Sequence, residues 1–540
     1  MKKKLIISVF SLLCVLLFAA CSGKKKDAAS NDEQPATFSA SVSNEYLKVL
    51  PADAIAIIKC DLGNLLEKSE ILDNVFVKAG IEKGIMELPE DQRYLIKRVC
   101  EDPDNSGVNV NAPVYIAVVN MEPARAVLAM AMDDVEKFEG TLSTITGGEH
   151  SCTTRDGMKH IETGEAEFAI AYDSDKLIIV CDERYASVAS YIELDEDEMA
   201  LNKEMFASVF ESDDDMMCAW DIELCGEALI ESGDVEPELE PFFAMLQGCA
   251  LYLSNDFEKG YFASNADLTL PAELRDAIDS LVKKSTHRHF KYIPAKSFAV
   301  ASYNFDMTHL YPTLQSTGVL SELNANGVSN GLVKDVLKAL SGDYTVACWM
   351  NGRNIEDVQL MAAVDCNDRS VFDLLAAYIV YEFDARKVDT DVYALNLNRE
   401  EEYNYYTGEY EIVTRGSDYY IMYKDGALMF MPENLYNELE KGGELQPLRN
   451  SIMENSLFAS MDNDLVLDIK PIREIVAHEI NSAGEDDKAV LGMLDMLKSI
   501  TVNFNIYNLD AKWNFNDSSV NSLKCLTDEI VSLVVQDNLF

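Results

Sequence analysis

The chain has 540 residues and carries 93 aspartates and glutamates against 45 lysines and arginines, which gives a formal net charge of −48 at pH 7. Proteins that bind nucleic acids depend on lysine and arginine to neutralise phosphates, so this composition argues against a nucleic-acid partner. Hydrophobic residues make up 48% of the chain, which is typical of a globular protein and excludes a disordered acidic tail.

The first 21 residues have the layout of a bacterial secretory signal. Lys2, Lys3 and Lys4 precede an apolar run, Leu5 to Ala20, and a cysteine follows. A membrane-spanning helix needs about 20 apolar residues, and this run ends sooner, at two small residues. Phe18-Ala19-Ala20-Cys21 resembles a lipobox, although leucine usually stands at the position of Phe18.

The lipobox resemblance implies that residues 1–20 are a signal peptide and that Cys21 carries the lipid. The modification would be a thioether-linked diacylglycerol, usually with an added acyl chain such as palmitate. Two or more chains anchor a protein stably, whereas one chain binds a membrane only marginally. Removal of the signal with its three lysines changes the formal charge from −48 to −51.

Residues 21–44 are mostly small and polar, and we expect them to form a flexible tether. Its coil dimension is about 26 Å, estimated from chain length and linker statistics. Lipoproteins that are exported to the cell surface tend to have acidic residues after the cysteine, whereas Lys24, Lys25 and Lys26 are basic here. We therefore expect a cell-envelope protein that is lipid-anchored in the outer membrane and faces the periplasm.

Ten cysteines follow Cys21, and most of them lie inside apolar runs. Free cysteine behaves as a small buried hydrophobe, so this placement favours packed thiols. The chain contains no C-x-x-C motif, which disfavours zinc ribbons and thioredoxin-like chemistry. One or two disulfides remain possible in an exported protein, and their pairing is left open.

Four sequence landmarks occur twice in the same order, which predicts a tandem duplication. The pairs are an aromatic followed by Pro51 or Pro294, hairpins over 114–134 and 344–365, hairpins around Tyr172–Leu177 and Tyr423–Leu428, and Phe206-Ala207-Ser208 with Phe458-Ala459-Ser460. We assign the first repeat to residues 45–286 and the second to residues 287–540.

Each repeat is predicted to be an α+β unit with a mostly antiparallel sheet. Strands come in pairs joined by polar turns, such as Asp173-Ser174-Asp175 and Lys424-Asp425-Gly426, and neighbouring hairpin strands are antiparallel. Helices are expected over 272–284, 331–341 and 485–499, between groups of strands rather than after every strand. This order favours α+β over a doubly wound fold. A groove between the repeats would be the default ligand site.

Two stretches of the mature chain resemble an uncharacterised family of large Bacteroidota lipoproteins that carry a domain of unknown function. They are the opening with Tyr46 and Leu50-Pro51-Ala52-Asp53-Ala54, and the segment from Asp102 to Tyr115. The resemblance implies location and general architecture. It implies no activity and no site residues.

Catalytic and metal-binding motifs are incomplete or missing from the sequence. His478-Glu479 begins like a zincin motif, but Ser482 stands where the second histidine belongs. The segment Asp102–Gly107 begins like a calcium loop and has Pro113 at the position of the last carboxylate. His287 and His289 are interpreted as a surface pair in a linker. We therefore expect no cofactor and no metal site.

Acidic runs are interpreted as solvated turns. Asp213-Asp214-Asp215 precedes a predicted strand in the first repeat, and Asp462 and Asp464 stand at the matching turn of the second.

Seven tyrosines lie between residues 403 and 423: Tyr403, Tyr405, Tyr406, Tyr410, Tyr419, Tyr420 and Tyr423. The matching stretch of the first repeat, roughly Cys152 to Tyr172, has one. Tyrosines give a rigid, amphipathic contact surface on which sugars or proteins dock. Packing of a tyrosine-rich hairpin on its own sheet is the alternative. Tyr403, Tyr405, Tyr406 and Tyr410 are the candidate ligand or partner surface.

The leading functional hypothesis is a membrane-anchored envelope lipoprotein that binds or scaffolds a protein or a glycan without catalysis. The alternative is a periplasmic hydrolase that acts on glycans with a pair of carboxylates.

Overall fold

The computed structural model describes most of the chain after the tether. The described residues are 44–121, 123–146, 151–162, 167–192, 194–232, 248–270, 272–316, 320–321, 324, 329–396, 399–404, 409–414, 418–442, 464–483, 488–505 and 507–536. They divide into two compact units. The first comprises residues 1–271 and 515–540, and the second comprises residues 272–514.

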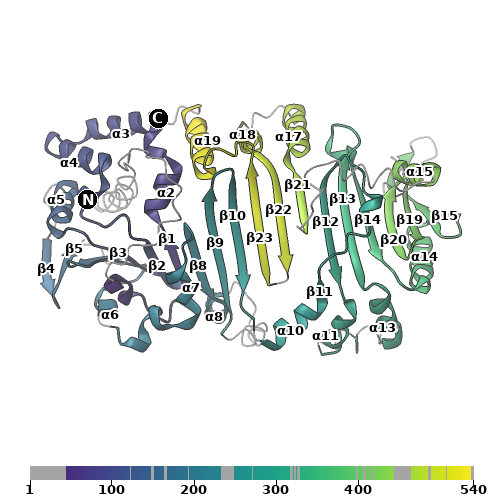
Figure 1. The fold of residues 1–540 in the computed structure, drawn as a ribbon, viewed down its shortest axis with the longest axis horizontal. Helices are drawn as coiled ribbons and strands as arrows, with labels where there is room; N and C mark the ends of the chain where they lie inside the picture. Colours follow the sequence, from purple (N-terminus) through teal and green to yellow (C-terminus); the bar gives the residue numbers. More distant parts are fainter. Residues whose placement is uncertain are drawn as a thin grey trace, which may run out of the picture. The chain divides into compact units, whose positions relative to one another are not determined.

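The first unit is built on an antiparallel sheet, whose strands run from purple through blue to teal in Figure 1. Its strands, in the order in which they pair, are β4 (Ser151–Arg155), β5 (Met158–Glu162), β6 (Phe168–Tyr172), β7 (Lys176–Asp182), β3 (Ala124–Ala131), β2 (Val114–Met121), β1 (Ala56–Cys60), β8 (Met216–Asp221), β9 (Ala250–Glu258) and β10 (Tyr261–Leu268).

The second unit has its own antiparallel sheet. In pairing order it contains β15 (Arg386–Asp389), β16 (Val392–Leu395), β19 (Tyr419–Lys424), β20 (Ala427–Pro432), β14 (Val358–Asp365), β13 (Gly342–Met350), β12 (Ser297–Phe305), β21 (Leu465–Asp468) and β22 (Leu497–Asn505). The short strand β11 (Val282–Lys283) pairs with the far end of β12, and β23 (Asn508–Phe515) follows β22.

Helices connect the strands and cover the sheets. In the first unit the longer ones are α2 (Leu62–Ser69), α3 (Val75–Glu87), α4 (Glu90–Glu101), α5 (Val135–Thr146), α8 (Ile222–Ser232) and α19 (Ser522–Gln536). In the second unit they are α10 (Ala272–Leu281), α13 (Asn330–Ala339), α14 (Arg369–Phe383), α15 (Glu433–Gly442), α17 (Ile469–Ala483) and α18 (Lys488–Met496). The predicted α+β class is confirmed.

The two units share one order of strand connections. Strand pairs β6–β7 and β19–β20 occupy the same place in each unit, and there Tyr172 lies opposite Leu177 and Tyr423 opposite Leu428. Each of these tyrosines contacts a buried phenylalanine of the helix that follows the preceding hairpin, Phe138 on α5 or Phe372 on α14. The two units therefore share a topology, and the tandem duplication stays a prediction. Phe458, the fourth landmark of the second repeat, lies outside the described residues.

The C-terminal helix α19 belongs to the first unit. Its Val531 joins a small buried cluster with Leu72 and Val77. At its edge Asp528 accepts a hydrogen bond of 2.9 Å from the Asn74 amide, and Lys524 forms an ion pair of 3.2 Å with Glu70. Helix α19 therefore contributes to the packing of the first unit.

One expected helix is shorter than predicted, because α10 ends at Leu281 and Val282 begins β11. The ten cysteines after Cys21 are free thiols. Cys21 and most of the tether lie outside the described residues. None of the helices in the described part of the chain is long and apolar enough to cross a membrane.

Candidate functional site

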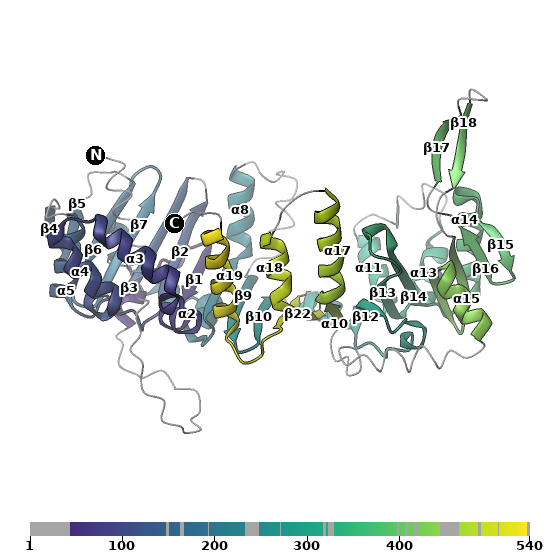
Figure 2. The same cartoon turned by 90° about the horizontal axis from the view of Figure 1, so that it is seen from above.

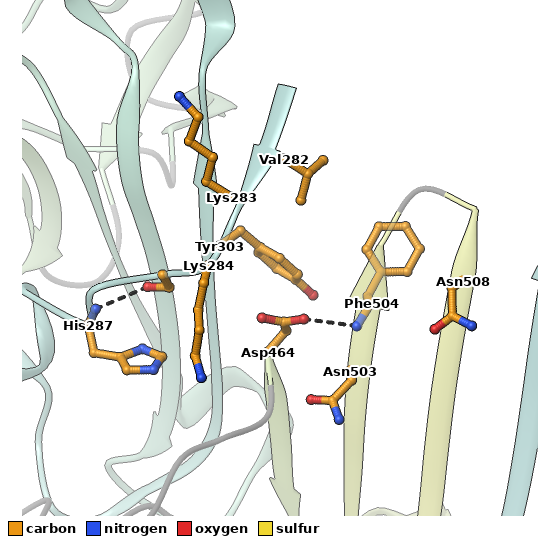
Figure 3. A pocket seen from close by; sticks show the side chains of 10 residues that line it. Val282, Lys283, Lys284, His287, Tyr303, Asp464, Asn503, Phe504 and Asn508 are labelled. Carbon is orange, nitrogen blue, oxygen red and sulfur yellow. Dashed lines mark hydrogen bonds between the residues drawn. The ribbon is translucent and has the colours of Figure 1, made fainter. Parts of the chain in front are cut away.

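A cavity of about 330 Å³ opens in the second unit beside the start of β21. Its walls come from β11 and the loop after it, from β12, and from β22 and β23, as Figure 3 shows. The residues that line it are Val282, Lys283, Lys284, Ser285, His287, Tyr303, Asp464, Asn503, Phe504 and Asn508. This volume is at the lower end of the range for small-molecule sites.

One wall of the cavity is aromatic. The rings of Tyr303 and Phe504 meet edge to face, with centroids 6.3 Å apart and an interplanar angle of 87°. Phe504 is 38% exposed, which is high for a phenylalanine within a sheet. The amides of Asn503 and Asn508 lie on the same side (Figure 3). Apolar faces with a few convergent polar groups are the usual lining of a ligand site.

Charged groups of both signs also face the cavity. Asp464 accepts a hydrogen bond of 2.9 Å from the backbone amide of Phe504. Lys283 forms an ion pair of 2.7 Å with Asp306, which satisfies its charge. Lys284 is exposed and forms no ion pair with any residue that the structure describes. Figure 3 shows its side chain extending between His287 and Asp464.

The loop that carries Lys284 is held by a buried carboxylate. Asp343 is fully buried and accepts hydrogen bonds from the Thr286 amide at 3.0 Å and from the Asn304 side chain at 2.7 Å. Burial alone would raise the pKa of Asp343, but these hydrogen bonds favour the charged form and leave the pKa below its ordinary value. The loop is therefore positioned by an ionised group beneath it.

The histidine pair at this loop differs from the prediction. His287 lines the cavity, but His289 is 1% exposed, and its Nε2 lies 3.0 Å from the Asp365 carboxylate. The interpretation of both histidines as a surface pair in a linker was therefore wrong for His289. The chain turns at His287, where φ is +56°, and the turn sends the two side chains into different surroundings.

The first unit has an equivalent of Asp464, and there the site is filled. Asp215 precedes β8 as Asp464 precedes β21, and its carboxylate accepts a hydrogen bond of 2.8 Å from the Phe257 amide. The carbonyls of Asp215 and Asp464 accept from Asp61 and Ser302, each at 2.8 Å. The two aspartates therefore occupy the same position in the two sheets.

In the first unit a lysine occupies the space in front of this aspartate. The Lys68 ammonium lies 2.7 Å from Asp215, 2.8 Å from Asp256 and 3.2 Å from Glu258. Asp215 is 1% exposed, and burial raises its pKa to about 6 despite the hydrogen bonds from Lys68 and Phe257. The interpretation of Asp213–Asp215 as a solvated turn was wrong for Asp215.

A local difference in chain path explains why one site is filled and the other open. In the first unit β1 ends at Cys60, and Asp61 caps α2 by accepting a hydrogen bond of 3.0 Å from the Asn64 amide. Helix α2 then brings Lys68 over Asp215. In the second unit Ser302 takes the position of Asp61, and β12 continues to Phe305 and pairs with β11.

The tyrosine-rich segment separates into two parts. Tyr419, Tyr420 and Tyr423 belong to β19 and pack on neighbours, with Tyr420 6% exposed. Tyr403 and Tyr410 are direct partners in the register of a separate two-stranded sheet, formed by β17 (Arg399–Asn404) and β18 (Glu409–Thr414). Tyr405 and Tyr406 lie outside the described residues.

This two-stranded sheet is an addition to the second unit. It stands away from the larger sheet in Figure 2, between β16 and β19 in the chain. The equivalent strands of the first unit, β5 and β6, are joined across residues 163–167. The expected match of Cys152–Tyr172 to Tyr403–Tyr423 was therefore wrong, because β15 and β16 take the places of β4 and β5.

Metal ligands do not gather in the described part of the chain, where no group of three or more histidine, cysteine or acidic side chains could hold an ion. The Asp102 segment forms a short 3-10 turn, Pro103–Ser106, that ends at Gly107 with φ +84°. The Asn105 side chain donates to the Asp102 carbonyl at 2.9 Å and stabilises this turn.

Comparisons with known proteins identify the family without assigning a function. Residues 46–523 match the model of a domain of unknown function, DUF4836, and the chain belongs to that family. No curated protein matches the chain. Solved structures of TP0453 show a weak likeness: crystal form IV is 14% identical and crystal form I is 13% identical, each covering 45% of this chain and 91% or 88% of TP0453, with TM-scores of 0.24. A likeness at that TM-score carries no argument.

The filled site gives a stability prediction. Replacement of Lys68 by methionine should lower the free energy of unfolding by about 2–3 kcal/mol, because it leaves the buried Asp215 carboxylate without its cation. Urea unfolding at pH 7 measures the change. Lys78→Met is the matched control: Lys78 and its partner Asp73 are both exposed, so its loss should cost at most about 1 kcal/mol.

The cost of Lys68→Met should also grow with pH. Asp215 has an ordinary pKa of 3.8 and a folded-state pKa of about 6, so its ionisation removes stability as pH rises between these values. Without Lys68 the folded-state pKa rises further, and the loss continues above pH 6. Between pH 6 and pH 8 the free energy of unfolding should therefore fall more for the variant than for the wild type. An equal change in both proteins would contradict this account.

Proposed function

We propose that this chain is a cell-envelope lipoprotein that binds a small polar ligand in the cavity of its second unit. The lipid on Cys21 would hold it in the outer membrane on the periplasmic side, and the tether would let the folded part turn freely. The signal layout and the basic residues after Cys21 support this location. The DUF4836 match shows the family and gives no information about activity.

The observation that carries the binding proposal is the difference between two equivalent positions. The first unit fills the space in front of Asp215 with its own Lys68. The second unit keeps a cavity in front of Asp464, and Tyr303 and Phe504 are among the residues that line it. One unit closes this space with its own side chain, and the other unit surrounds it with aromatic and polar groups. The open space is therefore suited to an exchangeable ligand.

Binding fits the cavity better than the alternative of glycan hydrolysis. A hydrolase of the usual kind needs two carboxylates on either side of the scissile bond. Asp464 is the carboxylate that the described lining of the cavity supplies. Aromatic faces beside amides suit the ring and hydroxyl groups of a sugar, so a glycan remains a suitable ligand class without catalysis.

A second candidate surface is the β17–β18 hairpin, which suits a protein partner. Its two strands pair only with each other, and the described strands of the first unit include no counterpart. An isolated two-stranded hairpin is marginally stable in water, so contact with a partner would stabilise it. Tyr403 and Tyr410 are partners in its register, and tyrosine is a residue type that suits protein contacts.

The anchor is tested by Cys21→Ser. The variant should lose lipid attachment, so radiolabelled palmitate should not be incorporated and the protein should leave the membrane fraction. Cys152→Ser, which replaces an exposed thiol in the first unit, is the control and should stay membrane-bound. Membrane retention of Cys21→Ser would contradict the lipid anchor.

The cavity is tested by filling it. Asn508→Trp should abolish binding of any ligand found when saturation-transfer NMR screens sugars, amino sugars and amino acids against the wild-type protein. Asn330→Trp, on the exposed first turn of α13, should bind normally. If both variants bind the ligand equally well, the ligand binds elsewhere. If the screen finds no ligand, the proposal is wrong.

The hairpin is tested by a Tyr403→Ser/Tyr410→Ser variant in intact cells after cross-linking. Loss of a partner that the wild type captures, with unchanged ligand binding in the cavity, is the expected outcome. Capture of the same partner by the variant would show that the hairpin is not the docking surface.

A further inference from the structure

We infer that the ligand of the second-unit cavity carries a primary ammonium group, which binds Asp464 as Lys68 binds Asp215. The inference rests on the proposed function and adds the chemical class of the ligand. The inference is based on the equivalence of the two sites, because in the first unit the aspartate at this position binds an ammonium group, that of Lys68.

The equivalence extends to the residues around the aspartate. Met216 pairs with Asn255 in the first sheet, which places Asp256 beside Asp215. Leu465 pairs with Val502 in the second sheet, which places Asn503 beside Asp464. Two oxygen-bearing side chains therefore flank the same point in both units. In the first unit they are carboxylates, and in the second they are a carboxylate and an amide.

The acceptor geometry suits an ammonium ion. The Lys68 ammonium has three N–H donors and uses three side-chain acceptors, at 2.7, 2.8 and 3.2 Å. In the second unit the Asp464 carboxylate has one donor in place already, the Phe504 amide at 2.9 Å. Its remaining capacity faces the cavity, together with the Asn503 amide (Figure 3).

The second site has fewer carboxylates than the first, and this difference explains why it would release its ligand. Three carboxylates surround Lys68, and their hydrogen bonds raise its pKa above the ordinary value although burial acts in the opposite direction. That arrangement suits a permanent ion pair. One carboxylate with a neutral amide holds a cation less strongly, and the aromatic side chains of Tyr303 and Phe504 would add apolar contact to the rest of the ligand.

Lys284 is the local competitor for Asp464. Its side chain extends beside Asp464 but forms no ion pair with a described residue, so its ammonium is free to swing toward solvent. An incoming ammonium would displace it from the neighbourhood of the carboxylate. Removal of the Lys284 charge should therefore strengthen binding of a cation, whereas it would weaken binding of an anion.

The test distinguishes two sources of a primary ammonium, a free amino sugar and the lysine side chain of a peptide. The test uses isothermal titration calorimetry on the full-length protein in detergent at pH 7. The probes are glucosamine, its uncharged analogue N-acetylglucosamine, Nα-acetyl-lysine amide, and the same lysine derivative with a trimethylated side chain. Binding of glucosamine alone indicates the sugar, and binding of the lysine derivative indicates the peptide.

Three variants make the assignment specific. Asp464→Asn should weaken binding of the amine roughly 10- to 100-fold, because a hydrogen bond to a charged group is lost. Asp215→Asn, the equivalent change in the first unit, should leave binding unchanged. Lys284→Gln should strengthen binding roughly two- to fivefold. The trimethylated probe, which keeps its charge and has no N–H donors, should bind more weakly than the primary amine.

Failure of this inference is distinguishable from failure of the proposed function. If N-acetylglucosamine or another neutral ligand binds as well as the amine, and Asn508→Trp abolishes that binding, the cavity is the site and the ammonium is wrong. If Lys284→Gln abolishes binding, the ligand is an anion and the ammonium is again wrong. A melting temperature of Asp464→Asn within a few degrees of wild type shows that the variant is folded. If the variant is unfolded, Lys284→Gln and the trimethylated probe still test whether the ligand binds through an ammonium group.

Discussion

A carboxylate at the start of a central strand is the constraint on which both units depend. Asp215 and Asp464 each accept a hydrogen bond from the backbone of the neighbouring strand, which fixes a negative charge at the same point of each sheet; Asp215 is buried there and Asp464 is partly exposed. A buried charge is costly unless it is paired and hydrogen-bonded. The first unit pairs it with Lys68. In the second unit the carboxylate faces a cavity, and this difference from the first unit is what makes the cavity a candidate binding site.

The hairpins were the predictable parts of the chain. Alternating apolar residues and polar turns indicated hairpins around Tyr172 and Tyr423, and in the structure Tyr172 lies opposite Leu177 and Tyr423 opposite Leu428. These are local patterns with a period of two, which report directly on strand pairing. The same comparison misplaced the segment at Tyr403, because an inserted hairpin shifts the alignment of everything between β16 and β19.

The site itself was beyond sequence reasoning, for a physical reason. Asp215 and Asp464 both stand in acidic runs, and an acidic run is usually solvated. Their carboxylates accept hydrogen bonds from the backbone amides of Phe257 and Phe504, which are distant in the chain and become neighbours when the strands pair. One usable signal was present: an aspartate precedes the equivalent strand in both repeats, while the residue after the first strand changes from Asp61, a helix cap, to Ser302.

The shared topology of the two units gives a reason why binding would arise at this position. The first unit, which carries its own Lys68, already has the acceptors for an ammonium ion, so the same arrangement without helix α2 leaves the site open. The extension of β12 and its pairing with β11 keep the exposed strand edge paired while the space stays open. The strongly acidic chain, at −48, would also raise the local concentration of cations around the cavity. Charge and architecture therefore favour the same class of ligand.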